Sequence, residues 1–485
     1  MFFKQIFEPK LAQYAYLIGC QRTGEAIVID PMRDIQRYLG EAASAGLTIT
    51  AVAETHIHAD YLSGMRQFAQ QTGVRIYASD EGGAEWRYNW LVGSAYDHRP
   101  LKNHDKFKIG NITFEALHTP GHTPEHMIFK VTDSGAGVSS PMGLLTGDYV
   151  FVGDVGRPDL LESAAGIAGA MRPSAETLGR SLQIFNDFDP ALQVWPGHGA
   201  GSACGKALGA VPTSTVGYEL ENNASLIAAR DQKKFVDYIL TGQPEPPMYF
   251  ARMKRDNRDG PAVLDKMPEP APLAVKDIRA LLDRAEVALI DTRSWDEYRT
   301  GHLPGSIFAP CNREFNTVAG CYVDEKTPMY LVIGEANVQS ATIDLIRIGL
   351  DDVAGFITPA ALGDYASSGG KLSVIEQISA AELETRRMEP DAFMLDVRRG
   401  DEVESSGAIP GASVIAHTRL LPRLSEIPSK ENVYITCRTG QRSAYACGFL
   451  ASRGYNAINL AGGFLAWREH GGEIQAPKQT VPAAT

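Results

Sequence analysis

Histidine and aspartate side chains of the kind that bind metals are concentrated in the segment HIHAD, where His56, His58 and Asp60 alternate. The segment follows the apolar run LTITAVAE, which is typical of a buried strand. Alternate side chains of an extended turn point to one side, and imidazole and carboxylate groups are ligands of first-row transition metals. Three further candidates stand in glycine-containing turns next to strand-like runs: His122 in GHTPEH, Asp148 in TGDYVF and His198 in PGHGAG. The sequence therefore predicts a metal site.

Cys437 is a second residue that could do chemistry. In ITCRTGQRSAYA it ends a strand-like run, and the six-residue loop CRTGQR leads from it into a helix. Backbone N–H groups and the positive end of such a helix stabilise a thiolate or a persulfide anion. Arg438 and Arg442 add positive charge, so we expect both to contribute to substrate binding. The pattern favours a nucleophilic cysteine over the alternative, a buried structural one.

Strand and helix signals alternate around the predicted metal site. EAIVID and LTITAVAETH are typical of strands, and the amphipathic segments between and after them end in Gly46 and Gly73. A Pro-rich stretch at 243–275 is typical of a linker. The expected fold class is therefore α/β, with several domains.

The rest of the chain contains a repeat. VALIDTRSWDEYRTGHLPGS (287–306) resembles FMLDVRRGDEVESSGAIPGA (393–412), because each is an apolar strand ending in Asp followed by a Gly-x-x-Pro-Gly turn. Downstream, the middle unit has GEANVQS where the C-terminal unit has the loop with the cysteine, and alignment on the helix that follows puts Gly334 in the place of Cys437. Without a thiol the middle unit cannot perform the same chemistry, so we expect a scaffold or docking role.

The histidine and aspartate signatures resemble those of the metallo-β-lactamase superfamily over about residues 1–250. The resemblance implies an αββα sandwich with the metal at one edge. Binuclear zinc hydrolases of that superfamily continue HxHxD with another histidine, whereas this chain has Tyr61. A phenol is a poorer ligand at neutral pH than a neutral imidazole, so the second metal site is predicted to be weakened.

GDYVFVGDVGRPDL and PGHGAGSACGK resemble one branch of that superfamily, the persulfide dioxygenases. That resemblance implies a mononuclear Fe(II) site with three protein ligands, namely His56, His122 and Asp148. His58, Asp60 and His198 are then expected to support these ligands; the alternative is that they bind a second metal.

Two residues near these signatures have open roles. Arg157, in GDVGRPDL, is a candidate for contact with an anionic substrate, and the alternative is an arginine that staples its loop. Cys204, six residues after His198, is a candidate sulfur relay, and the alternative is a small packed residue.

The loop CRTGQR, together with LDVR and GAIPGA upstream, resembles the active loop of rhodaneses over about residues 376–474. Six residues are typical of sulfurtransferases, whereas the related phosphatase-like loop is one residue longer. The predicted domains are a metallo-β-lactamase-like domain at 1–265, an inactive rhodanese-like domain at 270–372 and an active rhodanese domain at 376–474.

Composition limits the partners. The net charge is −12 and no block of five Lys or Arg occurs, so neither nucleic acid nor an anionic membrane is expected to bind. The N-terminal sequence has no apolar signal segment and no run of 18 apolar residues occurs, so a cytoplasmic protein is expected. The six cysteines are scattered without a CxxC pair, which excludes a disulfide framework. A homo-oligomer is expected.

The whole chain resembles the bacterial multidomain persulfide dioxygenase-sulfurtransferases. The resemblance implies that Fe(II) and O2 oxidise a low-molecular-weight persulfide to sulfite, and that Cys437 exchanges sulfur between thiosulfate, sulfite and a thiol, in sulfide detoxification. Glutathione, coenzyme A and cysteine all remain open as the thiol. One alternative is a zinc thioesterase of the glyoxalase II type fused to sulfurtransferase units. Another is a sulfur carrier or sensor without dioxygenase activity.

Overall fold

The chain forms two compact units. The computed structural model describes residues 1–164, 166–284 and 286–476. The first unit comprises Met1–Lys266 together with Ile346–Gly349, and the second comprises Met267–Leu345 and Leu350–Thr485. Among the helices of the described residues, none combines the length and the apolar character needed to cross a membrane.

The first unit contains two mixed sheets of six strands each. The first sheet has the strands in chain order, namely β1 (Phe2–Glu8), β2 (Gln13–Cys20), β3 (Glu25–Ile29), β4 (Thr48–Ala53), β5 (Arg75–Ser79) and β6 (His98–Leu101). The second also has them in chain order, namely β7 (Lys106–Ile109), β8 (Ile112–His118), β9 (Met127–Asp133), β10 (Gly143–Gly147), β11 (Gln193–Pro196) and β12 (Ser214–Thr215). A hydrophobic cluster joins the two sheets, with Tyr16 and Ile27 from the first and Phe114 and Phe129 from the second.

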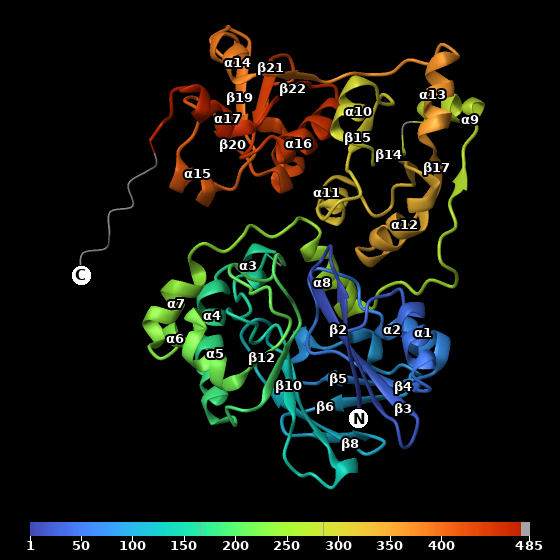
Figure 1. The fold of residues 1–485 in the computed structure, drawn as a ribbon, viewed down its shortest axis with the longest axis vertical. Helices are drawn as coiled ribbons and strands as arrows, with labels where there is room; N and C mark the ends of the chain where they lie inside the picture. Colours follow the sequence, from blue (N-terminus) through green and yellow to red (C-terminus); the bar gives the residue numbers. More distant parts are fainter. Residues whose placement is uncertain (165, 285, 477–485) are drawn as a thin grey trace. The chain divides into compact units, whose positions relative to one another are not determined.

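Helices cover the outer faces of both sheets. Tyr38 and Phe68 of the first two helices pack on the first sheet, and Leu178 and Phe235 of two later helices pack on the second. In Figure 1 these two groups of helices, blue and green, lie on opposite sides of the strands. The helices are α1 (Gln36–Ser44), α2 (Met65–Thr72), α3 (Leu160–Ser163), α4 (Met171–Ser181), α5 (Val216–Asn222), α6 (Ala224–Ala228), α7 (Gln232–Leu240) and α8 (Phe250–Asp259). The predicted αββα sandwich is confirmed.

The second unit contains two parallel sheets of five strands with the same topology. The first has the order β13 (Ala271–Pro272), β17 (Val353–Ile357), β16 (Met329–Val332), β14 (Ala288–Asp291), β15 (Ser306–Phe308). The second has the order β18 (Glu376–Ile378), β22 (Asn456–Leu460), β21 (Asn432–Thr436), β19 (Ala392–Asp396), β20 (Ser413–Val414). The repeat read from the sequence is therefore a repeat of a complete sheet.

Helices pack on each of these sheets around its own core. The middle core includes Ile278, Val332 and Leu362, and the C-terminal core includes Leu383 and Trp467. The helices are α9 (Val275–Leu282), α10 (Trp295–Thr300), α11 (Phe315–Tyr322), α12 (Val338–Arg347), α13 (Pro359–Ser367), α14 (Ala380–Arg386), α15 (Gly400–Ser406), α16 (Gln441–Ala451) and α17 (Gly463–His470). The exact domain limits at 265, 270, 372, 376 and 474 stay predictions.

Candidate metal centre and sulfur-transfer site

His56, His122 and Asp148 come together in the first unit from three different loops. His56 follows β4, His122 lies between β8 and β9, and Asp148 follows β10. One ligand atom from each lies within 4.8 Å of the others, and all three residues are buried. The Asp148 Oδ2 atom is 3.8 Å from His56 Nε2 and 3.6 Å from His122 Nε2. Both Asp148 carboxylate oxygens lack a hydrogen-bond partner among the described residues. A buried carboxylate in that state fits a bound cation.

The Nδ1 atoms of His56 and His122 already have hydrogen-bond partners. His122 Nδ1 lies 2.9 Å from the Arg157 carbonyl oxygen, which can only accept. His56 Nδ1 lies 2.9 Å from the Thr55 hydroxyl, which itself donates to Asp30 Oδ2 at 3.0 Å. Each Nδ1 is therefore the protonated nitrogen, and each Nε2 presents its lone pair to the centre. Burial also lowers the pKa of both histidines well below the usual value, which favours the neutral ligand form.

The residues predicted to support the ligands form two groups, one around His58 and one around His198 and Asp60. His58 Nε2 lies 3.3 Å from Asp30 Oδ1. Burial lowers the pKa of His58, but the charge and hydrogen bond of Asp30 outweigh burial and raise that pKa to about 9. His198 Nε2 lies 3.5 Å from both Asp60 Oδ2 and Asp148 Oδ1. Asp60, His198 and Cys204 form a second group of potential ligands whose atoms lie within 4.8 Å of one another.

Tyr61 is held away from a ligand role. Its hydroxyl donates to the Asp30 carbonyl oxygen at 3.3 Å and accepts from Gln13 Nε2 at 3.2 Å. Burial raises the pKa of this phenol well above its usual value, so the phenol stays protonated. A protonated phenol is a weak ligand, which disfavours a tightly bound second metal.

Arg157 and Cys204 lie in neighbouring loops. The Arg157 guanidinium forms two hydrogen bonds with Asp159, from Nε at 2.8 Å and from Nη2 at 2.5 Å, and Nη1 donates to the Ala203 carbonyl oxygen at 2.9 Å. The structure therefore shows Arg157 as a staple between two loops, and its contact with a substrate stays a prediction. Burial raises the pKa of Cys204 well above that of a free thiol, and its relay role also stays a prediction.

Two functional candidates were missed in the sequence. Asp30 stands at the end of β3 with a positive φ of 53° and bonds Thr55 and His58, but nothing in EAIVID marks it. Lys254 on α8 is only 4% exposed, and its Nζ has no hydrogen-bond partner among the described residues. In sequence, RMKRDNRD is typical of a solvated helix, so only burial identifies this lysine.

The position of Lys254 follows from how α8 is attached. One turn further along the helix, Asn257 donates to the carbonyl oxygens of His58 and Tyr61 and accepts from the Ser63 backbone N–H at 2.8 Å. Burial is the main cause of the lowered pKa of His122 and His56, and the positive charge of Lys254 acts in the same direction on both. The Lys254 Nζ atom also lies over the Trp86 ring, 5.4 Å from its centroid. A buried ammonium without a hydrogen-bond partner is costly, so this lysine is suited to bind an anion next to the His/Asp group.

Cys437 directly follows β21, and its sulfur is enclosed by the loop. The Gly440 backbone N–H donates to Sγ at 3.1 Å, and the Ser443 hydroxyl donates to Sγ at 3.5 Å. Gly440 has φ of 93°, a conformation that favours glycine and lets the chain turn directly into α16. These donors stabilise a sulfur anion.

The two loop arginines differ in their environment. Arg442 binds Glu402 with both Nη atoms, at 2.6 and 2.7 Å. Burial raises the pKa of Glu402, but the hydrogen bonds and charge of Arg442 outweigh burial and lower that pKa to about 2. Arg438 is exposed. Substrate contact by either arginine stays a prediction.

Strand register corrects one detail of the alignment between the repeats. Asp291 pairs with Val332 as Asp396 pairs with Thr436, so Ile333, not Gly334, has the position of Cys437. The next helix begins at Val338 in the middle unit and at Gln441 in the C-terminal unit. The middle loop is thus one residue longer than the C-terminal one. Alignment on the helix alone ignored this extra residue and therefore assigned Gly334 to the position of Cys437.

Two family profiles match the regions of the chain that contain these candidate residues. The metallo-beta-lactamase superfamily profile matches residues 9–198, and the rhodanese-like domain profile matches residues 274–353 and 379–470. The chain belongs to the proteins that join a metallo-β-lactamase domain to two rhodanese-like domains.

Individual relatives cover different parts of the chain. A crystal structure of a metallo-beta-lactamase from Staphylococcus aureus subsp. aureus COL is 39% identical with a TM-score of 0.66, covering 74% of this chain and 98% of that one. A sulfurtransferase of Allochromatium vinosum is 36% identical over 107 residues, 22% of this chain and 99% of the relative. The mitochondrial persulfide dioxygenase ETHE1 of Bos taurus is 29% identical over 163 residues, 33% of this chain and 58% of the relative.

Proposed function

We propose that the metallo-β-lactamase domain oxidises low-molecular-weight persulfides with O2 to sulfite, at a mononuclear Fe(II) held by His56, His122 and Asp148. The observation that carries the proposal is the buried His/His/Asp group, in which both Nε2 atoms face an Asp148 carboxylate that has no hydrogen-bond partner among the described residues. Two imidazoles and one carboxylate are the ligand set of non-haem iron oxygenases. Iron held by these three residues would supply the redox chemistry for the reaction of O2 with the persulfide. Similarity to a persulfide dioxygenase supports this choice.

The protein's own groups bind and orient the substrate. The Lys254 ammonium attracts the anionic persulfide, and its burial excludes water that would weaken this attraction. Asp30 keeps Thr55 and through it the His56 ring in position. The Arg157 carbonyl oxygen does the same for His122.

We further propose that the C-terminal rhodanese domain transfers sulfur through Cys437. The Cys437 thiolate attacks the outer sulfur of thiosulfate, the S–S bond of thiosulfate breaks, and sulfite leaves with the electron pair. An acceptor thiolate then attacks the outer sulfur of the Cys437 persulfide, and the electron pair of the broken S–S bond returns to Cys437. The reverse sequence would turn sulfite into thiosulfate. The proposal includes a cytoplasmic location, a homo-oligomeric state and a role in sulfide detoxification.

Oxygen uptake on addition of glutathione persulfide tests the dioxygenase proposal. His122→Ala should lose the metal and the oxygen uptake but keep sulfur transfer from thiosulfate, because the two reactions use different domains. Asp148→Asn should lose iron, because the carboxylate is the anionic member of the group. His104→Ala, which changes an exposed histidine of the same domain, is the matched control. Full oxygen uptake by His122→Ala would refute the ligand assignment.

Lys254→Met tests the anion-binding role separately. The variant should keep its iron content, because no metal ligand is changed, and its KM for the persulfide should rise about ten-fold for loss of one buried charged contact. Lys254→Arg should restore part of this affinity. Unchanged KM in Lys254→Met would show that the lysine does not contact the substrate.

A binuclear zinc thioesterase is a second candidate function. It is favoured by the second group of potential ligands, Asp60, His198 and Cys204, next to the first. Metal analysis of the purified protein distinguishes the two functions. One iron per chain with persulfide-dependent oxygen uptake supports the dioxygenase; two zinc ions per chain with thioester hydrolysis supports the thioesterase. A metal-containing protein with neither activity supports the sulfur carrier or sensor.

A further inference from the structure

A pocket of about 420 Å³ lies between the two rhodanese-like domains, at the carboxyl ends of β18 and β22. Trp295, Phe308 and Asn312 of the middle domain form one wall. Gly440 and other residues of the loop that carries Cys437 form another. The carboxyl edge of a parallel sheet is where ligands of α/β proteins bind. The catalytically inert domain therefore lines a cavity beside the active loop.

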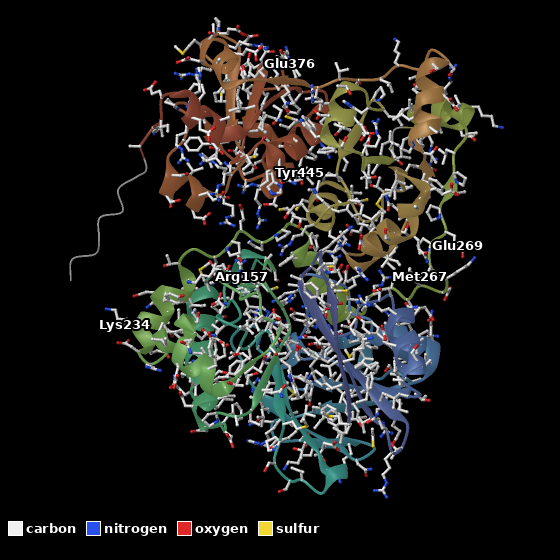
Figure 2. All side chains as sticks on the ribbon, viewed as in Figure 1. Arg157, Lys234, Met267, Glu269, Glu376 and Tyr445 are labelled. Atoms are coloured by element: carbon white, nitrogen blue, oxygen red, sulfur yellow. The ribbon has the colours of Figure 1, made fainter. Side chains whose placement is uncertain are left out.

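The aromatic part of the pocket comes from both domains. The ring centroid of Phe308 is 5.2 Å from that of Trp295 and 5.8 Å from that of Tyr445. Tyr445, labelled in Figure 2, accepts hydrogen bonds from Asn312 Nδ2 at 2.9 Å and from Gln441 Nε2 at 2.8 Å. The middle domain thus contacts the first turns of α16, which directly follow the active loop.

The polar part of the pocket consists of side-chain amides. Gln377 Oε1 accepts from Trp295 Nε1 at 2.7 Å and from Asn459 Nδ2 at 2.9 Å. Asn459 is 1% exposed, and its Oδ1 has no hydrogen-bond partner among the described residues. A buried acceptor without a partner is costly, so it marks a place for a ligand donor. No charged side chain lines the pocket, which selects a neutral group.

The pocket and the reactive sulfur share one stretch of backbone. Gly440 lines the pocket and also donates its N–H to Cys437 Sγ at 3.1 Å. Cys437 itself does not line the pocket. A small molecule bound there by its organic part would have its own sulfur near the outer side of the loop.

We propose that this pocket binds the neutral, amide-containing part of the thiol that accepts sulfur from Cys437, and that the middle domain thereby sets acceptor specificity. The inference rests on the proposed sulfur transfer. The acceptor thiolate attacks the outer sulfur of the Cys437 persulfide, its S–S bond breaks, and the electron pair returns to Cys437 Sγ. Aromatic rings hold the chain of the acceptor, and Asn459 Oδ1 accepts a hydrogen bond from its amide N–H.

Acceptor selectivity of the full-length protein tests this proposal. Sulfur transfer from thiosulfate is measured with cyanide, which is too small to need the pocket, and with pantetheine, a neutral thiol with two amide groups. In Trp295→Ala the ratio of kcat/KM for pantetheine to that for cyanide should fall about ten-fold, for loss of one aromatic wall. Asn459→Leu should lower the same ratio. Tyr330→Ala, an aromatic change in the middle domain outside the pocket, is the matched control and should leave the ratio unchanged.

The possible outcomes distinguish a failure of the sulfur-transfer proposal from a failure of the acceptor-pocket proposal. Wild-type protein that transfers no sulfur even to cyanide would overturn both the sulfur-transfer proposal and this inference. Transfer to cyanide combined with an unchanged ratio in both Trp295→Ala and Asn459→Leu would overturn the pocket alone. Transfer to cyanide without any transfer to pantetheine would also overturn it. The milder variant Trp295→Phe covers the case in which Trp295→Ala does not fold.

Discussion

The two rhodanese-like domains have the same framework at corresponding places. In the middle domain Arg293 binds Asp291 at the end of β14 and donates to the Gly301 carbonyl oxygen at 2.8 Å. In the C-terminal domain Arg398 binds Asp396 at the end of β19 and donates to the Gly407 carbonyl oxygen, also at 2.8 Å. These bonds fix the turn after the strand, so both domains keep the same backbone.

The domains differ where chemistry is possible. Cys437 is replaced by Ile333, and the carboxylate that binds Arg442 in one domain has another role in the other. Glu402 binds Arg442, whereas Glu297 accepts from the backbone N–H of Ser294 at 3.0 Å and caps α10. A few loop residues thus distinguish the domain that carries Cys437 from the domain that has no thiol at that position, and both domains line the shared pocket.

Among the changes that test this difference between the two domains, Cys437→Ser should have the largest effect on sulfur transfer. Sulfur transfer should fall to background, because a hydroxyl is a far weaker nucleophile and forms no persulfide. Mass spectrometry after thiosulfate treatment of the wild-type protein should show one added sulfur on the Cys437 peptide. Added sulfur on Cys311 or Cys321, with Cys437→Ser still active, would contradict the division of roles between the domains.

The double variant Ile333→Cys/Cys437→Ser tests whether the presence of a thiol is the only reason why the two domains differ in sulfur-transfer activity. Sulfur transfer should stay below about 1% of the wild-type rate, because the middle loop is one residue longer, carries the acidic Glu335 and supplies no arginine. The rate is measured with thiosulfate and cyanide. Recovered activity would show that only the missing thiol makes the middle domain inert.

Glu402→Gln and Glu297→Gln form a matched pair. The first should lower kcat/KM for thiosulfate about ten-fold, because Arg442 loses the charged, two-point partner that fixes its guanidinium. The second should leave kcat/KM unchanged, because Glu297 only caps a helix of the inert domain. If both changes altered kcat/KM for thiosulfate equally, both glutamates would contribute only to the stability of the protein.

The smallest expected effect is the pH dependence of the difference in unfolding free energy between the wild type and Glu402→Gln. The pKa of Glu402 is about 2 in the folded protein, below the usual 4.5, so its ion pair with Arg442 stabilises the folded state fully above pH 4.5. This stabilisation is lost as the pH falls from 4.5 towards 2, and Glu402→Gln lacks it at every pH. The wild type should therefore exceed the variant in unfolding free energy by less than about 1 kcal/mol near pH 6, and the difference should shrink in acid. Chemical denaturation followed by fluorescence measures it; a difference that grows in acid would refute the assignment.

Local sequence was enough to predict the candidate reactive residues and to detect the repeat. The histidines and aspartates stand in glycine turns after apolar runs, and Cys437 stands between a strand and a helix, so residue type and neighbours identify them. The two strand–Asp–turn segments likewise show the repeat without any structure. These signals are readable because each depends on residues only a few positions apart.

Tertiary structure decided which residues support that chemistry. Lys254 and Asp30 acquire their roles only when α8 and β3 are placed beside the turn that carries His56, and Ile333 is assigned only by strand pairing. The pocket needs Trp295 beside Gln377 and Asn459, which are separated from it by at least 82 positions in the chain. The physical reason is that burial and pairing are properties of packed surfaces, and residues distant in sequence become neighbours only after the sheets have formed.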